Sequence, residues 1–479
     1  MASMATPSPK SAAGSSKSRP RKPVARLRHG LSLLAGLAAF AQVVAPAWAQ
    51  QGRPTIIRDA EIETLIRDYT TPLLAAAKVN AGATKIYIVG DRSFNAFVAE
   101  GRNIFINTGA LMETETPNEI IGVLAHEIAH IAGGHLARQR MQLDRAAVMA
   151  VAGMLLSAGA LVGTARNRQV GMEGAAPVGI MLGPQEIIRR SLLAYQRTEE
   201  QAADIAAIKY LTATNQSAAG LLRTLERFNQ QALFAASRID PYLISHPLPA
   251  ERISFLATAA RQSPAFSVKD PPARQARHDL ARAKLVGFLA DANETARRYP
   301  VSDNSIHARY ARAIAAYRFG RVNEAIAQID QLIAAQPRNP YFHELKGQTL
   351  LEAGRAGQAI APLKQAVALA PGATPIRVML GHALVSTGNP QSAAEAVPIL
   401  TRVTQQEQEN ADAFQYLAMA YEKKGDQAMA QLSAAQALFI AGRFVEARTQ
   451  ASRAQKQFKQ GTPGWLKADD ILNYRPNNQ

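Results

Sequence analysis

The 479-residue sequence contains no cysteine, and this absence excludes several kinds of site. Disulfide bonds, thiolate metal ligands, a cysteine nucleophile and a lipid-modified N-terminal cysteine all need a thiol. Any metal site must therefore be built from His, Asp and Glu. The chain is long enough for two or three domains, and its 47% content of hydrophobic residues is ordinary for globular proteins.

Asp and Glu are absent from residues 1–49, and this acid-free segment predicts an export signal. An apolar run from Leu31 to Val44 is too short for a comfortable membrane span, and Ala47-Trp48-Ala49 then offers a small-x-small cleavage site. We therefore predict a signal peptide over 1–49, with an uncleaved anchor as the alternative. An exported chain without cysteine suits a bacterial periplasm. The basic residues before the apolar run are Lys10, Lys17, Arg19, Arg21, Lys22, Arg26 and Arg28.

The formal net charge is +17, and removing these seven basic residues leaves +10. That charge could favour acidic partners or anionic membrane surfaces. No basic stripe interleaved with aromatic residues is present, so we predict no nucleic-acid partner.

Residues 50–262 mix strand and helix patterns and are predicted to form an α+β domain. Thr84–Val89 and Asn103–Asn107 have the β-branched and aromatic composition of strands. A helix is predicted to start at Thr116 and Pro117, with Glu119 completing a capping box, and to stop at Gly133-Gly134. Ala146 to Val162 is predicted to be a buried core helix, with contact to a membrane surface as the alternative, and 163–184 a loop.

The predicted helix carries His126-Glu127-Ile128-Ala129-His130. Residues four apart lie on one helix face, so His126 and His130 can bind one Zn²⁺. Glu127 lies beside that face and suits a general base that takes a proton from metal-activated water. For this set of residues, the alternative is accidental recurrence of a short motif on a core helix.

A third metal ligand is needed, and the position six residues after His130, where some zinc peptidases have histidine, is Leu136. We predict that Glu200 completes a two-histidine, one-glutamate site. Asp204, one turn later, can accept the N–H of a ligating histidine and fix its tautomer. The alternative is a solvated acidic helix face. His135 is predicted to support the site or to lie at the surface.

His246 lies in Ser245-His246-Pro247-Leu248-Pro249, where two prolines stiffen the backbone. Three roles stay open for it. It could occupy the fourth position on zinc as a plug, donate a hydrogen bond to the oxyanion, or simply bond to backbone.

A strand near the metal could bind substrate backbone by strand addition, which selects extended chains. We predict that the second strand is this edge strand, with residues Asn103, Ile104, Phe105, Ile106 and Asn107. Such a site would favour unfolded or unassembled protein substrates.

After a proline-rich segment the sequence repeats with a period of 34 residues. Gly320, Gly354 and Gly388 are 34 apart, as are Ala325, Ala359 and Ala393, and Gly425 with Ala430 follows after a three-residue insertion. This pattern resembles the tetratricopeptide repeat, in which each unit is a pair of antiparallel helices. We predict a linker over 263–274, a tetratricopeptide-repeat array over 275–460 and a C-terminal tail over 461–479.

The motif at His126 with Glu200-Gln201-Ala202-Ala203-Asp204 some seventy residues later resembles the HtpX and CAAX-prenyl-protease family of metallopeptidases. Asn95-Ala96-Phe97 and the segment from Ser245 to Arg252 resemble its exported branch, in which repeats follow the catalytic domain. The resemblance implies one Zn²⁺ per chain, endopeptidase activity, a site that includes Arg252, and quality control of outer-membrane proteins. The fold class is then an α+β zincin-like metallopeptidase domain followed by an all-α solenoid.

Two functions are compatible with this sequence. The first is a periplasmic zinc endopeptidase that degrades misfolded or stalled envelope proteins, with repeats that dock clients or the outer-membrane assembly machinery. The second is a chaperone-like or scaffolding module in which proteolysis is secondary. The intact set of His126, Glu127, His130 and Glu200 favours the enzyme.

Overall fold

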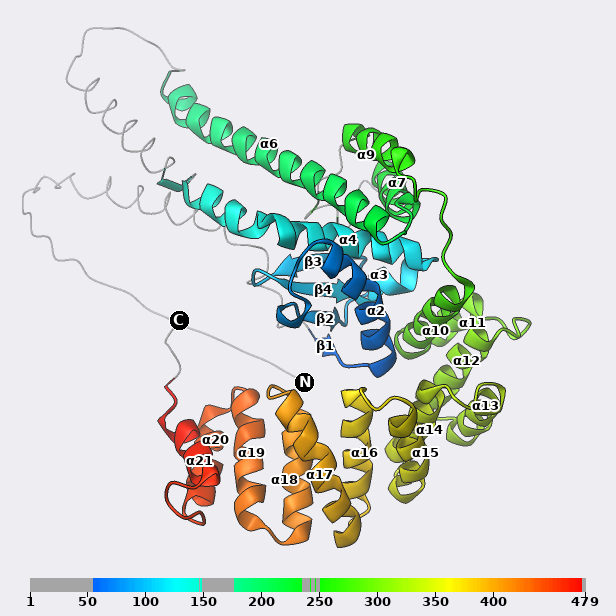
Figure 1. The fold of residues 1–479 in the computed structure, drawn as a ribbon, viewed down its shortest axis with the longest axis vertical. Helices are drawn as coiled ribbons and strands as arrows, with labels where there is room; N and C mark the ends of the chain where they lie inside the picture. The colour runs from blue at the N-terminus through cyan, green and yellow to red at the C-terminus, as the bar shows by residue number, and fades with distance from the viewer. Residues whose placement is uncertain are drawn as a thin grey trace, which may run out of the picture. The chain divides into compact units, whose positions relative to one another are not determined.

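The computed structural model describes residues 55–145, 147–148, 176–234, 242, 246 and 250–475 (Figure 1). The predicted signal peptide and most of the apolar segment 146–162 lie outside these residues. From Thr55 onward the chain forms one compact unit.

A four-stranded sheet begins the described chain. Its strands are β1 (Ile56–Ile57), β2 (Ile86–Val89), β3 (Ala96–Ala99) and β4 (Asn103–Asn107), in the order β1-β2-β4-β3. The pair β2–β4 is parallel and the other two pairs are antiparallel. Ile88, Ile104 and Ile106 are buried on one face, while Tyr87, Phe105 and Phe97 stack in a row on the other.

The prediction that Asn103–Asn107 is the edge strand is wrong, because β4 pairs with β2 on one side and with β3 on the other. The edge strand on that side is β3, which reaches β4 through a tight hairpin. Glu100 and Gly101 in the hairpin both have positive φ, 51° and 86°. Strand β3 has only four residues, two of them alanines, so its intrinsic strand propensity is low. Pairing with β4 in the hairpin stabilises it.

Helix α4 (Pro117–Gly133) carries the histidine motif and is the central element of the first part of the molecule. Figure 1 shows α4 between the sheet and α6 (Ala176–Ala213), and it also packs on α2 (Ala60–Ala76) and α7 (Ala219–Phe234). It begins at Pro117 and ends with Gly134 in the left-handed conformation, as the sequence predicts. The predicted capping box does not form, because Thr116 makes no capping hydrogen bond and Glu119 accepts from the Glu115 N–H and the Thr116 hydroxyl. Residues 117–129 are buried throughout, which fixes the helix that positions the site.

Shorter elements of this part of the described chain are α3 (Thr108–Glu113), α9 (Ala250–Gln262), a helix over His135–Arg145 and a 3₁₀ turn η2 (Ala81–Ala83). The loop predicted over 163–184 is wrong for its last residues, because α6 already begins at Ala176. Pro177 lies in the first turn, where proline is tolerated. Pro184 lies in the interior of α6, so the glycine and proline content of this stretch does not exclude helix.

From Pro272 onward every regular element of the described chain is a helix. From α11 to α21 each helix packs against the next one along the chain, and together with the first part these helices confirm the predicted fold class. The helices are α10 (Pro272–Leu289), α11 (Ala292–Arg298), α12 (Ile306–Arg318), α13 (Val322–Ala335), α14 (Pro340–Glu352), α15 (Ala356–Leu369), α16 (Thr374–Ser386), α17 (Pro390–Gln406), α18 (Ala411–Lys424), α19 (Gln427–Ile440), α20 (Phe444–Gln455) and α21 (Pro463–Asn473). The last of them lies in the segment predicted as a tail.

The repeated glycines have two structural roles. Gly320, Gly354 and Gly388 have φ of 78°, 75° and 70° and end a helix in the left-handed conformation. Gly347 and Gly381 instead allow close helix crossings, since a Cβ there would come within 2.4 Å and 2.5 Å of a leucine side chain on the neighbouring helix. The 34-residue period therefore reflects both helix ends and helix contacts.

Within the described part of the chain no single helix is long and apolar enough to cross a membrane. Residues 117–133 and 135–145 meet the length and composition criteria only as a pair, which is bent by 58°.

A buried ionic cluster joins the first part to the repeats. The Lys284 ammonium of α10 lies 2.8 Å from Asp59, 3.5 Å from Glu61 and 3.3 Å from Glu344. Tyr310 donates a hydrogen bond to Glu61 at 3.0 Å. One buried cation thus neutralises carboxylates from the start of α2 and from the repeat helix α14.

We expect Lys284→Met to lower the free energy of unfolding by about 3–5 kcal/mol near neutral pH, because it leaves buried carboxylates without a cation. Burial raises the pKa of Glu61 and of Glu344 to about 7. Carboxyls with a raised folded-state pKa stabilise the fold at low pH, and this contribution is lost as the pH rises through about 7. The deficit of the variant should therefore be smaller at about pH 5 than at about pH 8.

Urea denaturation followed by circular dichroism measures both effects. The matched control is Lys364→Met, which breaks the half-exposed pair with Glu395 and should cost less than about 1 kcal/mol. Equal losses for the two variants, or a deficit that does not change with pH, would contradict the role given to Lys284.

Candidate metal centre

Four side chains from three segments converge beside α4. Each of His126, His130, Glu200 and His246 offers one ligand atom, and these atoms lie within 4.8 Å of one another. The two histidines of α4 face α6, which supplies Glu200, and His246 approaches from the segment before α9. The structure thus brings together the residues that the sequence analysis assigns to the metal.

The separations match those of ligands around one small ion. The Nε2 atoms of His126 and His130 are 3.0 Å apart, and Glu200 oxygens lie 3.3 Å and 3.4 Å from them. Ligands about 2.0–2.1 Å from a tetrahedral zinc ion would be about 3.3–3.4 Å apart. Two imidazoles and a carboxylate are also the donor types that zinc prefers.

Glu127 lies next to this cluster and is not part of it. Its side chain is 1% exposed, and its Oε1 is 3.4 Å from His246 Nε2. Neither of these two atoms has a hydrogen-bond partner among the described residues. Buried polar atoms normally have a partner. Their arrangement fits a site in which Glu127 acts on a bound reactant and leaves ligation to its neighbours.

Asp204 and Arg252 support the ligands from behind. Asp204 Oδ1 lies 3.0 Å from His126 Nδ1, on the side of the ring away from the ligand atom. The Arg252 guanidinium donates to both oxygens of Asp204, at 2.7 Å and 3.0 Å, and lies 2.8 Å from Glu200. All three groups are almost fully buried, so each charge is held by a partner.

His135 positions the other ligating histidine. Its Nδ1 is 2.9 Å from His130 Nδ1, and its Nε2 is 2.9 Å from Glu199, which also pairs with Arg138. The ring folds back over Gly133, where a Cβ would come within 2.1 Å of it. His135 is therefore a supporting residue, one of the two roles the sequence analysis allows, and Gly133 leaves the room for it.

His246 faces both the ligands and the base. Its Nδ1 is 3.1 Å from Glu200 and 3.4 Å from His126 Nε2. Its ring lies against Tyr242, with the ring centroids 4.7 Å apart, and its backbone N–H donates to the carbonyl of Tyr242 at 2.8 Å. This placement gives His246 the geometry of a fourth donor.

The charges favour cation binding. Burial raises the pKa of Glu200, but His246 and His126 more than compensate and hold it well below its ordinary value. Burial opposes a charge on His126, yet Asp204 and Glu200 raise its pKa to about 10. Burial and the neighbouring His126 lower the pKa of His130. Glu200 is thus ionised and His130 neutral, as ligands must be, whereas His126 has to release a proton when the metal binds.

The sequence analysis missed three residues around the site, namely Glu199, Arg138 and Tyr242. Glu199 directly precedes the predicted ligand Glu200, and Tyr242 lies four residues before His246. For Glu199 and Tyr242, this closeness to a predicted site residue was the only indication in the sequence. The contacts of all three residues depend on how separate segments of the chain meet.

We expect Asp204→Asn to lower metal affinity by about 10–100-fold while the fold is kept, because the ligand His126 loses its charged partner. Competition with a chromophoric chelator measures the affinity. The control is Asp470→Asn on the exposed face of α21. An unchanged affinity in Asp204→Asn would show that Asp204 does not act through the ligand.

Comparison with known proteins agrees with this geometry. The profile of peptidase family M48 matches residues 58–260, and that of the tetratricopeptide repeat matches 310–374. The beta-barrel assembly-enhancing protease of Escherichia coli K12 is 26% identical over 426 residues, which cover 86% of this chain and 82% of that protein. A protease HtpX homolog from Syntrophobacter fumaroxidans is 30% identical over 111 residues, which cover 22% of this chain and 39% of that protein.

Among solved structures, the crystal structure of MamA aligns with 33% of this chain and 90% of its own, at a TM-score of 0.28 and 22% identity. A likeness at that level supports no conclusion about function. The two profiles and the relatives matched along the chain, together with the ligand cluster on α4 and α6, identify residues 58–260 as a metallopeptidase part of the M48 type, which is followed by tetratricopeptide repeats.

Proposed function

We propose that this chain is a zinc-dependent endopeptidase of the periplasm that degrades misfolded or stalled outer-membrane proteins. The observation that carries the enzymatic part is the convergence of His126, His130 and Glu200 on one point, with the buried Glu127 beside them. The envelope role is supported by the predicted signal peptide and by the similarity to a beta-barrel assembly-enhancing protease.

In the proposed reaction His126, His130 and Glu200 hold the ion. Zinc at this position would lower the pKa of water and polarise the scissile carbonyl. Glu127 takes a proton from the attacking water as the new C–O bond forms, and returns it to the amine nitrogen as the C–N bond breaks. Burial raises the pKa of Glu127, which makes it a better proton acceptor than an exposed glutamate.

Substrate backbone would bind along β3, and not along β4 as predicted from the sequence. The side of β3 away from β4 pairs with no other strand of the described residues, and β3 packs on α4 next to the site. Strand addition uses main-chain hydrogen bonds and therefore selects extended segments over particular sequences. An unfolded or unassembled chain offers such segments.

The repeats are proposed to dock clients or the outer-membrane assembly machinery, since helical arrays offer extended concave surfaces. A chaperone-like or scaffolding role stays the alternative. If a variant without peptidase activity still protected its client proteins, that result would favour the chaperone-like role. The intact set of metal ligands favours proteolysis.

We expect His126→Ala and Glu200→Ala to lower the zinc content and to abolish cleavage of an unfolded outer-membrane protein, because each removes one of three ligands. Zinc is measured by mass spectrometry of the dialysed protein. The matched control is Glu226→Ala, an exposed position on α7. If Glu200→Ala kept zinc at the stoichiometry and affinity of the wild type, another residue would be the third ligand.

A further inference from the structure

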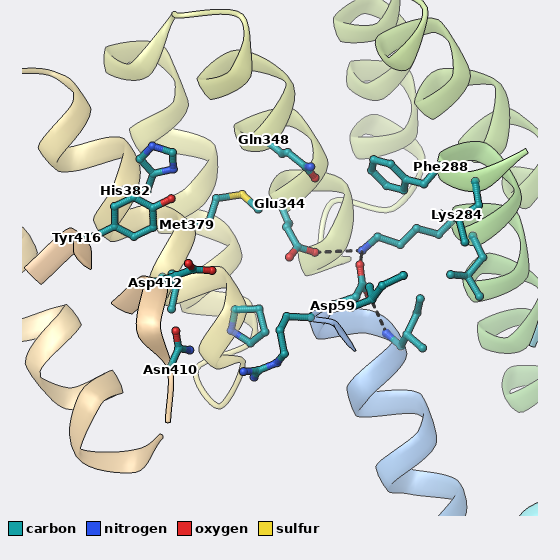
Figure 2. Close-up of a pocket in the computed structure, with 17 residues that line it drawn as sticks. Asp59, Lys284, Phe288, Glu344, Gln348, Met379, His382, Asn410, Asp412 and Tyr416 are labelled. Atoms are coloured by element: carbon teal, nitrogen blue, oxygen red, sulfur yellow. Dashed lines mark hydrogen bonds and ion pairs between the residues drawn. The ribbon is translucent and has the colours of Figure 1, made fainter. Parts of the chain in front are cut away.

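A pocket of about 450 Å³ lies between the start of the peptidase part and the repeat helices (Figure 2). Its walls come from the segment at Asp59, from α10 at Lys284 and Phe288, and from α14, α16 and α18. It is separate from the metal centre, none of whose ligands line it.

The residues that line the pocket include three carboxyls, those of Asp59, Glu344 and Asp412, and two cations, Arg58 and Lys284. Its two cations are already paired, Lys284 with Asp59, Glu61 and Glu344, and Arg58 with Glu63 and Glu407. In each group the carboxylates outnumber the cation.

Asp412 adds a further carboxylate, on α18. Its side chain forms no hydrogen bond or ion pair with another described residue, and it is exposed to the pocket. A positively charged ligand would supply the partner that this side chain lacks.

One wall is flat and weakly polar. The rings of His382 and Tyr416 stack, with centroids 4.2 Å apart and planes 12° apart, and Met379 lies beside them. Figure 2 shows Tyr416 and Asp412 on the same side of the pocket. A tyrosine ring next to a carboxylate suits the alkyl stem and cationic end of arginine or lysine.

The pocket continues along the repeats. Asp412 also lines a second hollow of about 630 Å³, formed by α18, α19 and α20. That hollow is lined by six alanines and four glutamines, with Met419, Glu422 and Arg443. The Arg443 guanidinium is already paired with Glu446, at 3.0 Å. Two adjoining hollows that share one residue fit a ligand longer than a single side chain.

We propose that this groove binds an extended, positively charged segment of a partner or client protein, with an arginine or lysine between Asp412 and Tyr416. The proposal specifies the chemistry of the docking role assigned to the repeats above and rests on it. Because Ile57 ends β1 and Asp59 caps α2, the bound segment would contact the peptidase part as well as the repeats.

The test uses the zinc-loaded full chain with Glu127→Gln and two fluorescent peptides, one of alternating arginine and leucine and one with glutamate in place of arginine. We expect the arginine peptide to bind at least about tenfold more tightly, and its affinity to fall as salt rises. Asp412→Asn should weaken it by roughly five- to tenfold, and the control Asp470→Asn should not.

Equal binding of the two peptides, or equal effects of Asp412→Asn and Asp470→Asn, would overturn the proposal. Mass spectrometry of the peptides after binding shows whether they were cut. If the Glu127→Gln chain binds the arginine peptide and still cleaves it, the role of Glu127 is contradicted. If this chain neither binds nor cleaves the peptide, only the proposed groove is contradicted. The two proposals therefore fail separately.

Discussion

Glu127→Gln is expected to keep its zinc and to lose cleavage of an unfolded protein by roughly 10²–10⁴-fold, the range in which general acid–base catalysis contributes. The change preserves the size of a side chain that is 1% exposed but removes its ability to take a proton. The ligand atoms belong to His126, His130, Glu200 and His246, so ligation is not lost.

Zinc content and the initial rate of cleavage, measured on the same preparation, test this expectation. Glu226→Gln on the exposed face of α7 is the matched control and should retain both. Retained turnover in Glu127→Gln would falsify the proposed proton transfer. Loss of zinc together with activity would show that Glu127 is needed to build the site, and the catalytic role would then lack support.

His246→Ala is expected to raise basal cleavage, by roughly three- to tenfold, while zinc stays bound. The reason is geometric. His246 Nδ1 lies 3.1 Å from Glu200 and 3.4 Å from His126 Nε2, which is where a fourth ligand would be. If this donor occupies the open coordination position, only molecules in which it has moved away can react, and removing it raises the reactive fraction.

The other two roles of His246 predict different results. A donor to the oxyanion would make His246→Ala slower by roughly 10²-fold or more. A histidine that only bonds to backbone would leave the rate unchanged, and its backbone N–H does donate to Tyr242. His343→Ala on α14, outside the site, is the control for a histidine removed elsewhere. The sign of the rate change decides between the three.

Local sequence patterns were enough to predict the residues that share one helix. His126 and His130 are one turn apart on α4, and Glu200 and Asp204 are one turn apart on α6, so helical periodicity placed each pair on one face. The repeated glycines likewise marked helix ends that have positive φ in the structure.

Features that depend on how distant segments meet were predicted poorly. Whether a strand is at an edge depends on its neighbours, and the weak propensity of Ala96–Ala99 hid the strand that covers β4. The contact of Arg252 with Asp204 was similarly invisible, because it joins α9 to α6. The ionic cluster around Lys284 joins residues from α2, α10 and α14, which no local pattern connects.

The most direct test of the account is to locate the metal in the zinc-loaded wild-type protein by anomalous diffraction at the zinc edge. The account predicts one ion per chain, within about 2.0–2.1 Å of His126 Nε2, His130 Nε2 and a Glu200 oxygen. Glu127 should lie beside the ion without ligating it. An ion bound elsewhere, or one ligated by Glu127 in place of Glu200, would contradict the assignment of this site.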